Sequence, residues 1–333
     1  MLTLARLRVR TLGWLLLGLM LASMIGLRYQ VGTDWYNYIG GYYDPSRTMS
    51  LLDALTASDP AFVLLNWVTT HLGVGIWLVN SFAGVVFVTG LIRFVRRLPE
   101  PLLAFTAAIP YVGIVVAMNY TRQAVAIGFV LWALPYLYDR RIARYLITIF
   151  IAATFHKSAV IFLPLVALAS DRNKLGVVLV ALFSAVFGYF VLLSEYINGL
   201  VNQYVASGYS QASQGAPFRV AMDALPAIVL LLARHRLQMN PVEKRVWIWI
   251  SLASLVAMVL VFRAPTAVDR VALYFSPIQF VIASYIPRLI TTNSRVLIRA
   301  VTITVYAGVL YVWLNYAANS YAWFPYQFYP LAG

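Results

Sequence analysis

Apolar runs of about twenty residues with almost no charge recur along the whole 333-residue chain. Each run is long enough to cross a bilayer whose hydrocarbon layer is about 30 Å thick. The composition agrees, because 62% of the residues are hydrophobic and only 11% are charged, about half the charged fraction of a typical soluble domain. These features predict an all-α polytopic membrane protein that forms one integral membrane domain over residues 1–333.

Eleven membrane spans are predicted from the positions of these runs. Two of them, 145–155 and 159–170, are about half the length of a straight crossing, so we expect a short helical hairpin that turns in or near the outer leaflet. The shorter apolar stretch 60–72 is interpreted as an amphipathic helix on the outer face, with a re-entrant segment as the alternative. The expected spans are 11–27, 75–92, 102–118, 124–138, 145–155, 159–170, 175–194, 220–233, 246–262, 271–287 and 297–315.

Positive charge is divided unevenly between the two sets of loops. With the N-terminus inside, the cytoplasmic segments and Arg299 hold 18 of the 25 Lys and Arg residues, which predicts an N-in, C-out topology. The net charge of +14 is therefore attributed to cytoplasmic loops and not to nucleic-acid binding. Residues 1–27 resemble a signal peptide in pattern, but we interpret them as an uncleaved anchor that the predicted topology needs.

Seven cations remain on the outer side, near the ends of the predicted spans. The planar guanidinium of Arg donates two hydrogen bonds to adjacent oxygens, which suits a diphosphate. For each cation the alternative is a side chain that snorkels to the membrane surface or forms an ion pair. The i,i+4 spacing of Arg219 and Asp223 predicts such an ion pair. The five candidates for diphosphate binding are Arg28, Arg122, Lys157, Arg263 and Arg270.

The segment "GLRYQVGTDWYNYIGGYYD", residues 26–44, contains one cation, two carboxylates and six aromatic rings directly after the first span. Carboxylates accept hydrogen bonds from vicinal sugar hydroxyls, and aromatic faces stack on sugar C–H edges. Asp34, Trp35 and Tyr38 therefore predict a sugar subsite, in which Asp34 either binds hydroxyls or acts as a base. A loop cap or a salt bridge to Arg28 is the alternative for Asp34, and an interfacial aromatic belt is the alternative for the rings.

His156 lies between the two short spans of the predicted hairpin. Ionisable residues within a membrane are candidate functional sites, and histidine titrates near neutral pH. His156 is therefore the second candidate base beside Asp34, and the alternative is a polar residue satisfied at a helix break. We expect no cofactor and no metal, because the chain has no cysteine and its three histidines are widely scattered.

Four stretches of the chain, "RYQVGTDWYNY", "NYTRQAVAIGF", "FHKSAVIFLPL" and "DRVALYFSP", resemble the EpsG family of Wzy-type polysaccharide polymerases in their order and topological place. The resemblance implies a GT-C-like enzyme of the bacterial cytoplasmic membrane whose site faces outwards. Its partners would be undecaprenyl-diphosphate-linked oligosaccharides, as donor and acceptor, with membrane lipid around it and room for a chain-length regulator protein. The matching positions in this sequence are Arg28, Gly32, Asp34, Arg122, Gln123, His156, Ser158, Arg270 and Tyr274. Candidates for substrate binding are Trp35, Tyr38, Gln123, Ser158, Asp269 and Tyr274.

The topology suits this chemistry independently, because nucleotide sugars and ATP are cytoplasmic and an outer-face transfer must use a lipid-linked donor. Two alternatives remain: a transporter or flippase of lipid-linked glycans, and a ligase that joins the glycan to another acceptor. The clustering of mid-span charges on the outer side disfavours transport. Acyl transfer is disfavoured because coenzyme A donors are cytoplasmic. Residues 175–245 contain no diagnostic match.

Overall fold

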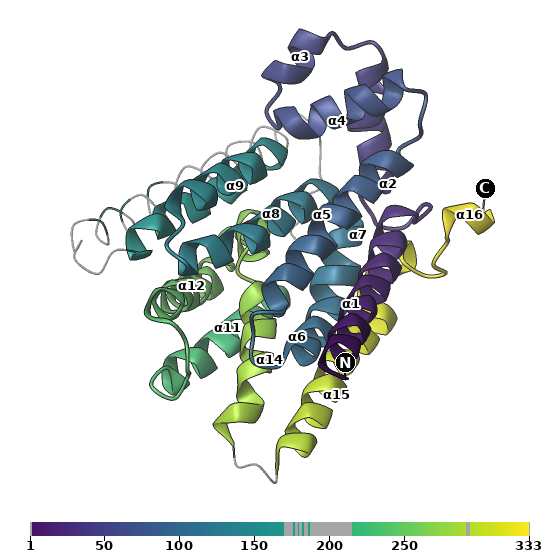
Figure 1. Cartoon of the computed structure of the whole chain (residues 1–333). Helices are drawn as coiled ribbons and strands as arrows, with labels where there is room; N and C mark the ends of the chain where they lie inside the picture. The colour runs from purple at the N-terminus through teal and green to yellow at the C-terminus, as the bar shows by residue number, and fades with distance from the viewer. Residues whose placement is uncertain are drawn as a thin grey trace.

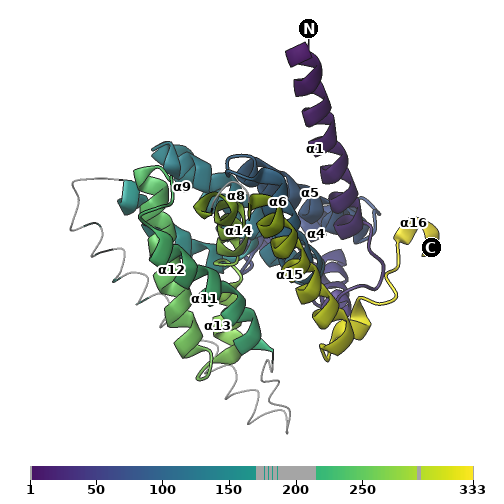
Figure 2. The ribbon, with the colours of Figure 1, turned by 90° about the horizontal axis from the view of Figure 1, so that it is seen from below.

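The computed structural model describes residues 2–169, 215–290 and 294–332, together with four isolated positions between 176 and 186. Apart from one isolated β-bridge, every named element in these ranges is a helix, and the long helices lie side by side as a bundle (Figure 1). Helix α1 (Leu2–Gly26) stands at the edge of the bundle, and its first residues project away from the other helices (Figure 2).

Among the residues that the structure describes, four segments are long and apolar enough to cross a membrane. They are α5 (Trp77–Val95), the continuous segment Pro101–Asn119, α11 (Ala216–Ala233) and α15 (Arg295–Tyr316). The 19 residues of α5 rise about 28 Å as an α-helix, close to the thickness of the hydrocarbon layer. The prediction of an all-α polytopic membrane protein is confirmed for the described residues. The count of eleven spans, the N-in orientation and the GT-C-like architecture stay predictions.

Most predicted spans coincide with helices to within a few residues. The segment Pro101–Asn119 consists of α6 (Pro101–Ala108), the π-helix η3 (Ile109–Val116) and α7 (Ala117–Asn119). Further matches are α8 (Thr121–Tyr138), α9 (Ile142–Phe155), α12 (Pro241–Leu260) and, for the amphipathic stretch 60–72, α4 (Pro60–His71). The predicted span 175–194 lies outside the described residues, apart from the four isolated positions.

The continuous span predicted over 271–287 is wrong. Helix α13 (Pro265–Ala272) ends at the start of that range, a turn of four residues follows, and α14 (Pro277–Leu289) begins directly after it. Proline lacks a backbone N–H and is favoured in the first turn of a helix, and Pro265 and Pro277 occupy the first positions of α13 and α14. The stretch before Arg270, expected to be a loop, is therefore helical.

The predicted hairpin around His156 is confirmed as a sharp break between two packed helices. Helix α9 ends at Phe155, His156 has an extended backbone (φ −155°, ψ 113°), and the 3-10 helix η4 (Lys157–Ala169) begins at the next residue. The two helices pack against each other, with Pro164 inside η4. The depth of this break in a membrane stays a prediction.

Helix α8 occupies the middle of the bundle, where it packs against α5 and α9. The contact with α5 is close because glycine faces glycine: Gly90 lies against the carbonyl of Gly128, and a Cβ at Gly128 would sit 2.7 Å from the Cα of Phe87. Small residues allow helix backbones to approach in this way. Because α8 is held in this way, Arg122 and Gln123 at its start have fixed positions in the bundle.

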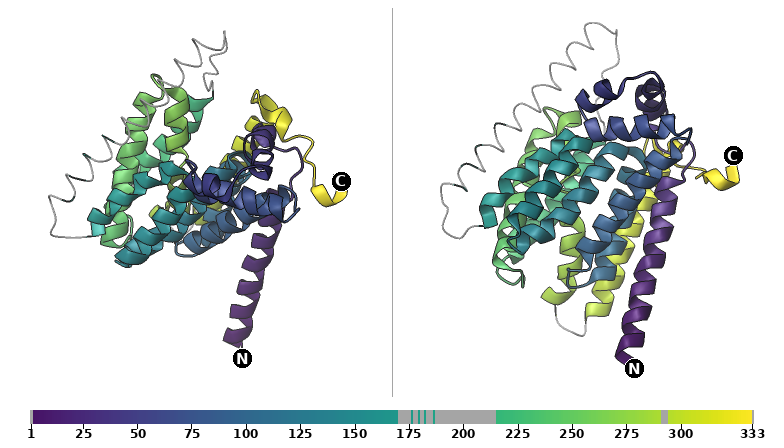
Figure 3. Two further views of the ribbon diagram at one scale, coloured as in Figure 1. Left: turned by 90° about the horizontal axis from the view of Figure 1, so that it is seen from above. Right: turned by 45° about the horizontal axis from the view of Figure 1, so that its top comes forward.

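Shorter elements gather at one end of the bundle, at the top of Figure 1. They are α2 (Trp35–Tyr38), the π-helix η1 (Ile39–Tyr43), the 3-10 helix η2 (Pro45–Arg47), α3 (Leu51–Thr56) and α4. The C-terminal tail, with η6 (Ser320–Ala322) and α16 (Tyr329–Ala332), returns to the same end beside the end of α1 (Figure 3). Arg28 and Phe328 form an antiparallel bridge there, and the first residues of α1 lie at the opposite end.

Candidate functional site

The turn that carries Asp34 is built on a glycine and an asparagine. Gly32 has a φ of +98°, and a Cβ at this position would lie 2.8 Å from the carbonyl oxygen of Met118. The Oδ1 atom of Asn119 accepts hydrogen bonds from the backbone N–H of Asp34 at 3.0 Å and from the hydroxyl of Thr33 at 3.1 Å. The end of α7 therefore holds the backbone of Asp34 in a fixed position.

The carboxyl group of Asp34 is half-buried and feels two cations. Burial raises its pKa above the ordinary value, while a hydrogen bond from Asn37 and the charges of Arg270 and Arg122 lower the pKa in turn. The Nδ2 atom of Asn37 lies 3.3 Å from Oδ1 of Asp34. Both guanidinium groups therefore lie within electrostatic range of this carboxyl group, as the predicted site requires.

Arg122 lies at the start of α8 and is held from two sides. Its Nη1 atom lies 2.6 Å from Oδ2 of Asp59, and its guanidinium carbon lies 4.7 Å from the centre of the Tyr42 ring. The backbone N–H of Arg122 also donates to the hydroxyl of Tyr38 at 3.4 Å. The predicted site residues Arg122 and Tyr38 are thus direct neighbours.

The break after α9 places His156 and Lys157 beside this arginine. The backbone N–H of Lys157 donates to Oδ1 of Asp59 at 3.2 Å, and its side chain is exposed. The charges of Arg122, Arg270 and Lys157 all act electrostatically on His156. Nδ1 of His156 lies 3.2 Å from the hydroxyl of Tyr274. Three of the predicted cations therefore lie within electrostatic range of one candidate base. The substrate-binding candidate Ser158, next to this break, is buried.

Arg270 and Gln123 join α13 to α8. Nε2 of Gln123 donates to the carbonyl oxygen of Arg270 at 3.0 Å, and the Arg270 side chain is exposed. The neighbouring Asp269 accepts two hydrogen bonds from Arg219, at 2.8 and 2.6 Å. This bidentate pair gives Asp269 a structural partner on α11. Arg263 lies exposed in the turn between α12 and α13.

Asp223 occupies a different environment from the one its i,i+4 spacing with Arg219 suggests. It is buried and accepts a hydrogen bond from Nε2 of Gln279 at 2.7 Å, with the hydroxyl of Ser276 at 3.5 Å. These two partners lie on and beside α14, whereas Arg219 pairs with Asp269 on α13.

Arg28 is placed differently from the other predicted cations, because it is only 1% exposed. Its guanidinium donates to the carbonyl oxygen of Ile25, to Oδ1 of Asn80 at 3.1 Å and to the hydroxyl of Thr121 at 2.8 Å. Burial lowers the pKa of Arg28 to about 10, so the group is still charged at neutral pH. Arg28 thus ties the end of α1 to the starts of α5 and α8. Trp35 lies under this guanidinium, at 5.8 Å from ring centre to guanidinium carbon.

The family model of the EpsG family matches residues 11–328, which is nearly the whole chain. The chain belongs to the EpsG family. This confirms the resemblance drawn from the four sequence stretches, and it makes the chain a member of a family of Wzy-type polymerase-like membrane proteins. No curated protein and no solved structure matches the chain.

Two residues of this EpsG-family site were missed as individual site residues. Asp59 was given no role from the sequence, although the pair Asp59-Pro60 signals a helix start in which Asp is the N-cap and Pro the first helical residue. Asn119 carried no signal of its own, because its role depends on how the segment around Asp34 folds back onto α7. Both residues act through side-chain oxygens that hold other site residues in place.

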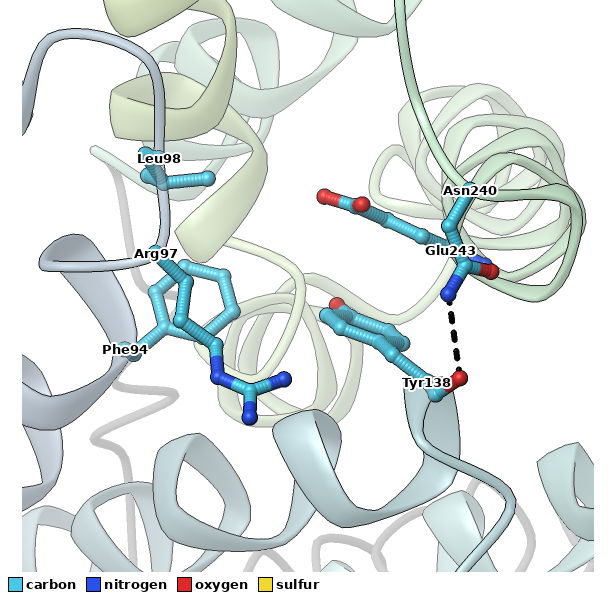
Figure 4. Close-up of a pocket in the computed structure, with 6 residues that line it drawn as sticks. All are labelled: Phe94, Arg97, Leu98, Tyr138, Asn240 and Glu243. Atoms are coloured by element: carbon cyan, nitrogen blue, oxygen red, sulfur yellow. Dashed lines mark hydrogen bonds between the residues drawn. The ribbon is translucent and has the colours of Figure 1, made fainter.

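A cavity of about 240 Å³ lies at the other end of α5 and α8, away from these residues. Figure 4 shows its lining: Phe94, Arg97, Leu98, Tyr138, Asn240 and Glu243. Arg97 forms a bidentate ion pair with Asp139, at 2.9 and 2.7 Å, and Nδ2 of Asn240 donates to the carbonyl oxygen of Tyr138 at 3.0 Å. These contacts join the ends of three helices, and none of the predicted site residues lines the cavity.

Proposed function

We propose that this EpsG-family protein is a membrane-embedded glycosyltransferase that joins undecaprenyl-diphosphate-linked oligosaccharide repeats on the outer face of the bacterial cytoplasmic membrane. Family membership supports a polysaccharide polymerase-like protein. The observation that carries the finer proposal is the gathering of Arg122, Lys157 and Arg270 around His156, two of them also acting on Asp34. Several cations beside two candidate bases suit a reaction whose leaving group is a diphosphate.

In the proposed reaction, a hydroxyl oxygen of the acceptor sugar attacks the anomeric carbon of the donor repeat. The bond between that carbon and the diphosphate oxygen breaks, and undecaprenyl diphosphate leaves with the bonding electrons. Arg122, Lys157 and Arg270 stabilise the charge that develops on the leaving group; one well-placed donor is worth about 3–4 kcal/mol in such a transition state. The hydroxyl proton passes to a base, which contributes on the order of 10²–10⁴-fold.

Two residues are candidates for this base. Asp34 has a backbone fixed by Asn119 and a carboxyl group near two cations. His156 has Nδ1 engaged with the hydroxyl of Tyr274, and its second ring nitrogen is proposed to accept the proton. The aromatic side chains Trp35 and Tyr38 follow Asp34 on α2 and are proposed to position sugar.

The diphosphate is assigned to Arg122, Lys157 and Arg270 in preference to Arg28. Diphosphate binding by Arg28 would require its buried guanidinium to give up partners on three segments of the chain. Leaving buried polar groups without partners costs free energy, so we assign Arg28 to holding the segment that carries Asp34.

The test is a polymerisation assay with purified protein and one defined lipid-diphosphate oligosaccharide, read as a ladder on a gel. Arg122→Ala and Arg270→Ala are expected to abolish or strongly shorten the ladder at normal protein levels. Arg47→Ala is the control, since Arg47 is exposed and pairs with Asp44 outside the cluster. Unchanged ladders in both cluster variants contradict the assignment. A wild-type protein that moves the lipid-linked substrate across liposomes without lengthening it contradicts the glycosyltransferase function and identifies a transporter.

A further inference from the structure

Asp59 stands immediately before α4 and is 4% exposed. Its two carboxylate oxygens have different partners: Oδ2 lies 2.6 Å from Nη1 of Arg122, and Oδ1 accepts the backbone N–H of Lys157 at 3.2 Å. These partners lie 63 and 98 residues away in the sequence. One buried carboxylate therefore joins the start of α4, the start of α8 and the break between α9 and η4.

Such a carboxylate is stable only with its partners in place. A buried charge is expensive unless an opposite charge and hydrogen bonds compensate it, and removing one partner leaves the other uncompensated. The side chain of Arg122 is 29% exposed although its Nη1 atom contacts the buried carboxylate, so part of this side chain stays accessible. Tyr42 covers this guanidinium from a second direction. Arg122 is thus held in a narrow range of orientations while part of it stays accessible.

We propose that Asp59 is a positioning residue that fixes Arg122 and the backbone of Lys157 relative to each other, so that both cations meet the same diphosphate. This inference rests on the proposed function. Without Asp59, the Arg122 side chain gains rotamer freedom that phosphate binding must then remove. The backbone of Lys157 loses the hydrogen bond that ties the helix break to α4. The contribution of Asp59 to phosphate binding therefore acts through Arg122 and through Lys157.

The experiment measures binding of inorganic pyrophosphate and, separately, of undecaprenyl diphosphate to the purified full-length protein in nanodiscs. The variants are Asp59→Asn, Arg122→Ala and the double variant, with Asp44→Asn as the matched control because Asp44 pairs with an exposed arginine. The side chain of Asp59 makes no capping hydrogen bond to α4, so Asp59→Asn removes the charge without removing a cap of this helix. Thermal unfolding of each variant checks the fold.

Asp59→Asn is expected to weaken pyrophosphate binding about 10-fold, which corresponds to about 1.4 kcal/mol. The double variant is expected to lose less affinity than the sum of the two single losses, because the part of the Asp59 contribution that acts through Arg122 is already absent in Arg122→Ala. Asp59→Glu keeps the charge and is expected to bind more tightly than Asp59→Asn. If Asp59→Asn does not fold, Asp59→Glu replaces it, with weaker binding than wild type and the same non-additivity expected.

Two results overturn the inference while the proposed function stands: wild-type affinity in the Asp59 variant, or additive losses in the double variant. A purely structural role predicts lower thermal stability with unchanged affinity, which is the first of these results. If the wild-type protein binds neither diphosphate, the proposed diphosphate site does not exist. The proposed function and the inference then both fail. If the protein binds undecaprenyl diphosphate but not pyrophosphate, the affinity comes from the lipid chain. This result also overturns the role of Asp59.

Discussion

The hydroxyl of Tyr274 lies 3.2 Å from Nδ1 of His156 and connects the turn between α13 and α14 to the break between α9 and η4. Tyr274 is 1% exposed and its ring packs near Phe162, with ring centres 6.2 Å apart. The phenol is therefore fixed by its surroundings, and it fixes the orientation of the imidazole in turn. This contact brings together two of the four sequence stretches that marked the family.

Replacing Tyr274 with Phe removes this hydrogen bond and keeps the buried ring. If His156 is the base, we expect the rate of polymerisation to fall about 10-fold, the size of one lost hydrogen bond of about 1.4 kcal/mol. The measurement is initial ladder growth at saturating substrate. Tyr316→Phe, at an exposed position on α15, serves as control. Wild-type kcat in Tyr274→Phe would assign the contact to packing alone.

The raised pKa of Asp34 predicts a pH-dependent rate if Asp34 is the base. A base must be deprotonated, so the rate of ladder growth is expected to rise with pH through the folded pKa of Asp34, which lies above its ordinary value of 3.8. Asp34→Asn is expected to lose this rise together with most of the activity. A pH–rate profile that is unchanged in shape in Asp34→Asn, at lower rate, assigns the titration to another group.

The raised pKa of Asp34 also predicts how this group changes the stability of the folded protein with pH. The folded protein holds the Asp34 proton more tightly than the unfolded chain, so this group contributes stability at low pH that is lost as pH rises through the folded pKa. Asp34→Asn carries no charge and is expected to unfold at a higher temperature than wild type at neutral pH. The difference should disappear below pH 3.8, which differential scanning calorimetry can follow. A lower midpoint at neutral pH contradicts this prediction.

The Arg219–Asp269 pair predicts a large loss of stability on truncation. Arg219→Met leaves Asp269, whose side chain is only 7% exposed, without its bidentate donor. Removing one partner of a buried pair costs about 3–5 kcal/mol, whereas an exposed pair is worth about 0–1 kcal/mol. Arg47→Met breaks the exposed pair with Asp44 and is the control. Equal unfolding midpoints for the two variants would show that the Arg219 pair is well solvated.

Gly32→Ala is expected to destabilise the turn that carries Asp34. The backbone conformation at φ +98° disfavours any side chain, and the new Cβ would meet the Met118 carbonyl at 2.8 Å. We expect a loss of more than about 1 kcal/mol and reduced ladder formation. Gly40→Ala is the matched control, because a Cβ there meets nothing within 4 Å. The comparison uses thermal unfolding and the polymerisation assay on both variants, and equal behaviour of the two would contradict the structural reading.

The sequence predicts helix positions well because apolar runs, prolines and charge clusters act locally. It also predicts that Arg122, Lys157 and Arg270 gather, since each lies at a span end on the same predicted side. Partners are harder to predict, because Asn80 and Thr121 lie 52 and 93 residues from Arg28 and nothing local marks them as acceptors for its guanidinium. The turn before Pro277 was missed because the apolar run continues through it without a charge.

The pairing of the tail with the segment after α1 sets an order for biosynthesis. The backbone N–H of Tyr29 donates to the carbonyl oxygen of Gln327. The hydroxyl of Tyr326 donates to the carbonyl oxygen of Met24, which lies 302 residues earlier in the chain. Nearly the entire polypeptide must therefore be translated before the extended segment around Arg28 can pair with the C-terminal tail. A chain that ends before the tail would lack the contacts that hold the segment around Arg28 and the end of α1.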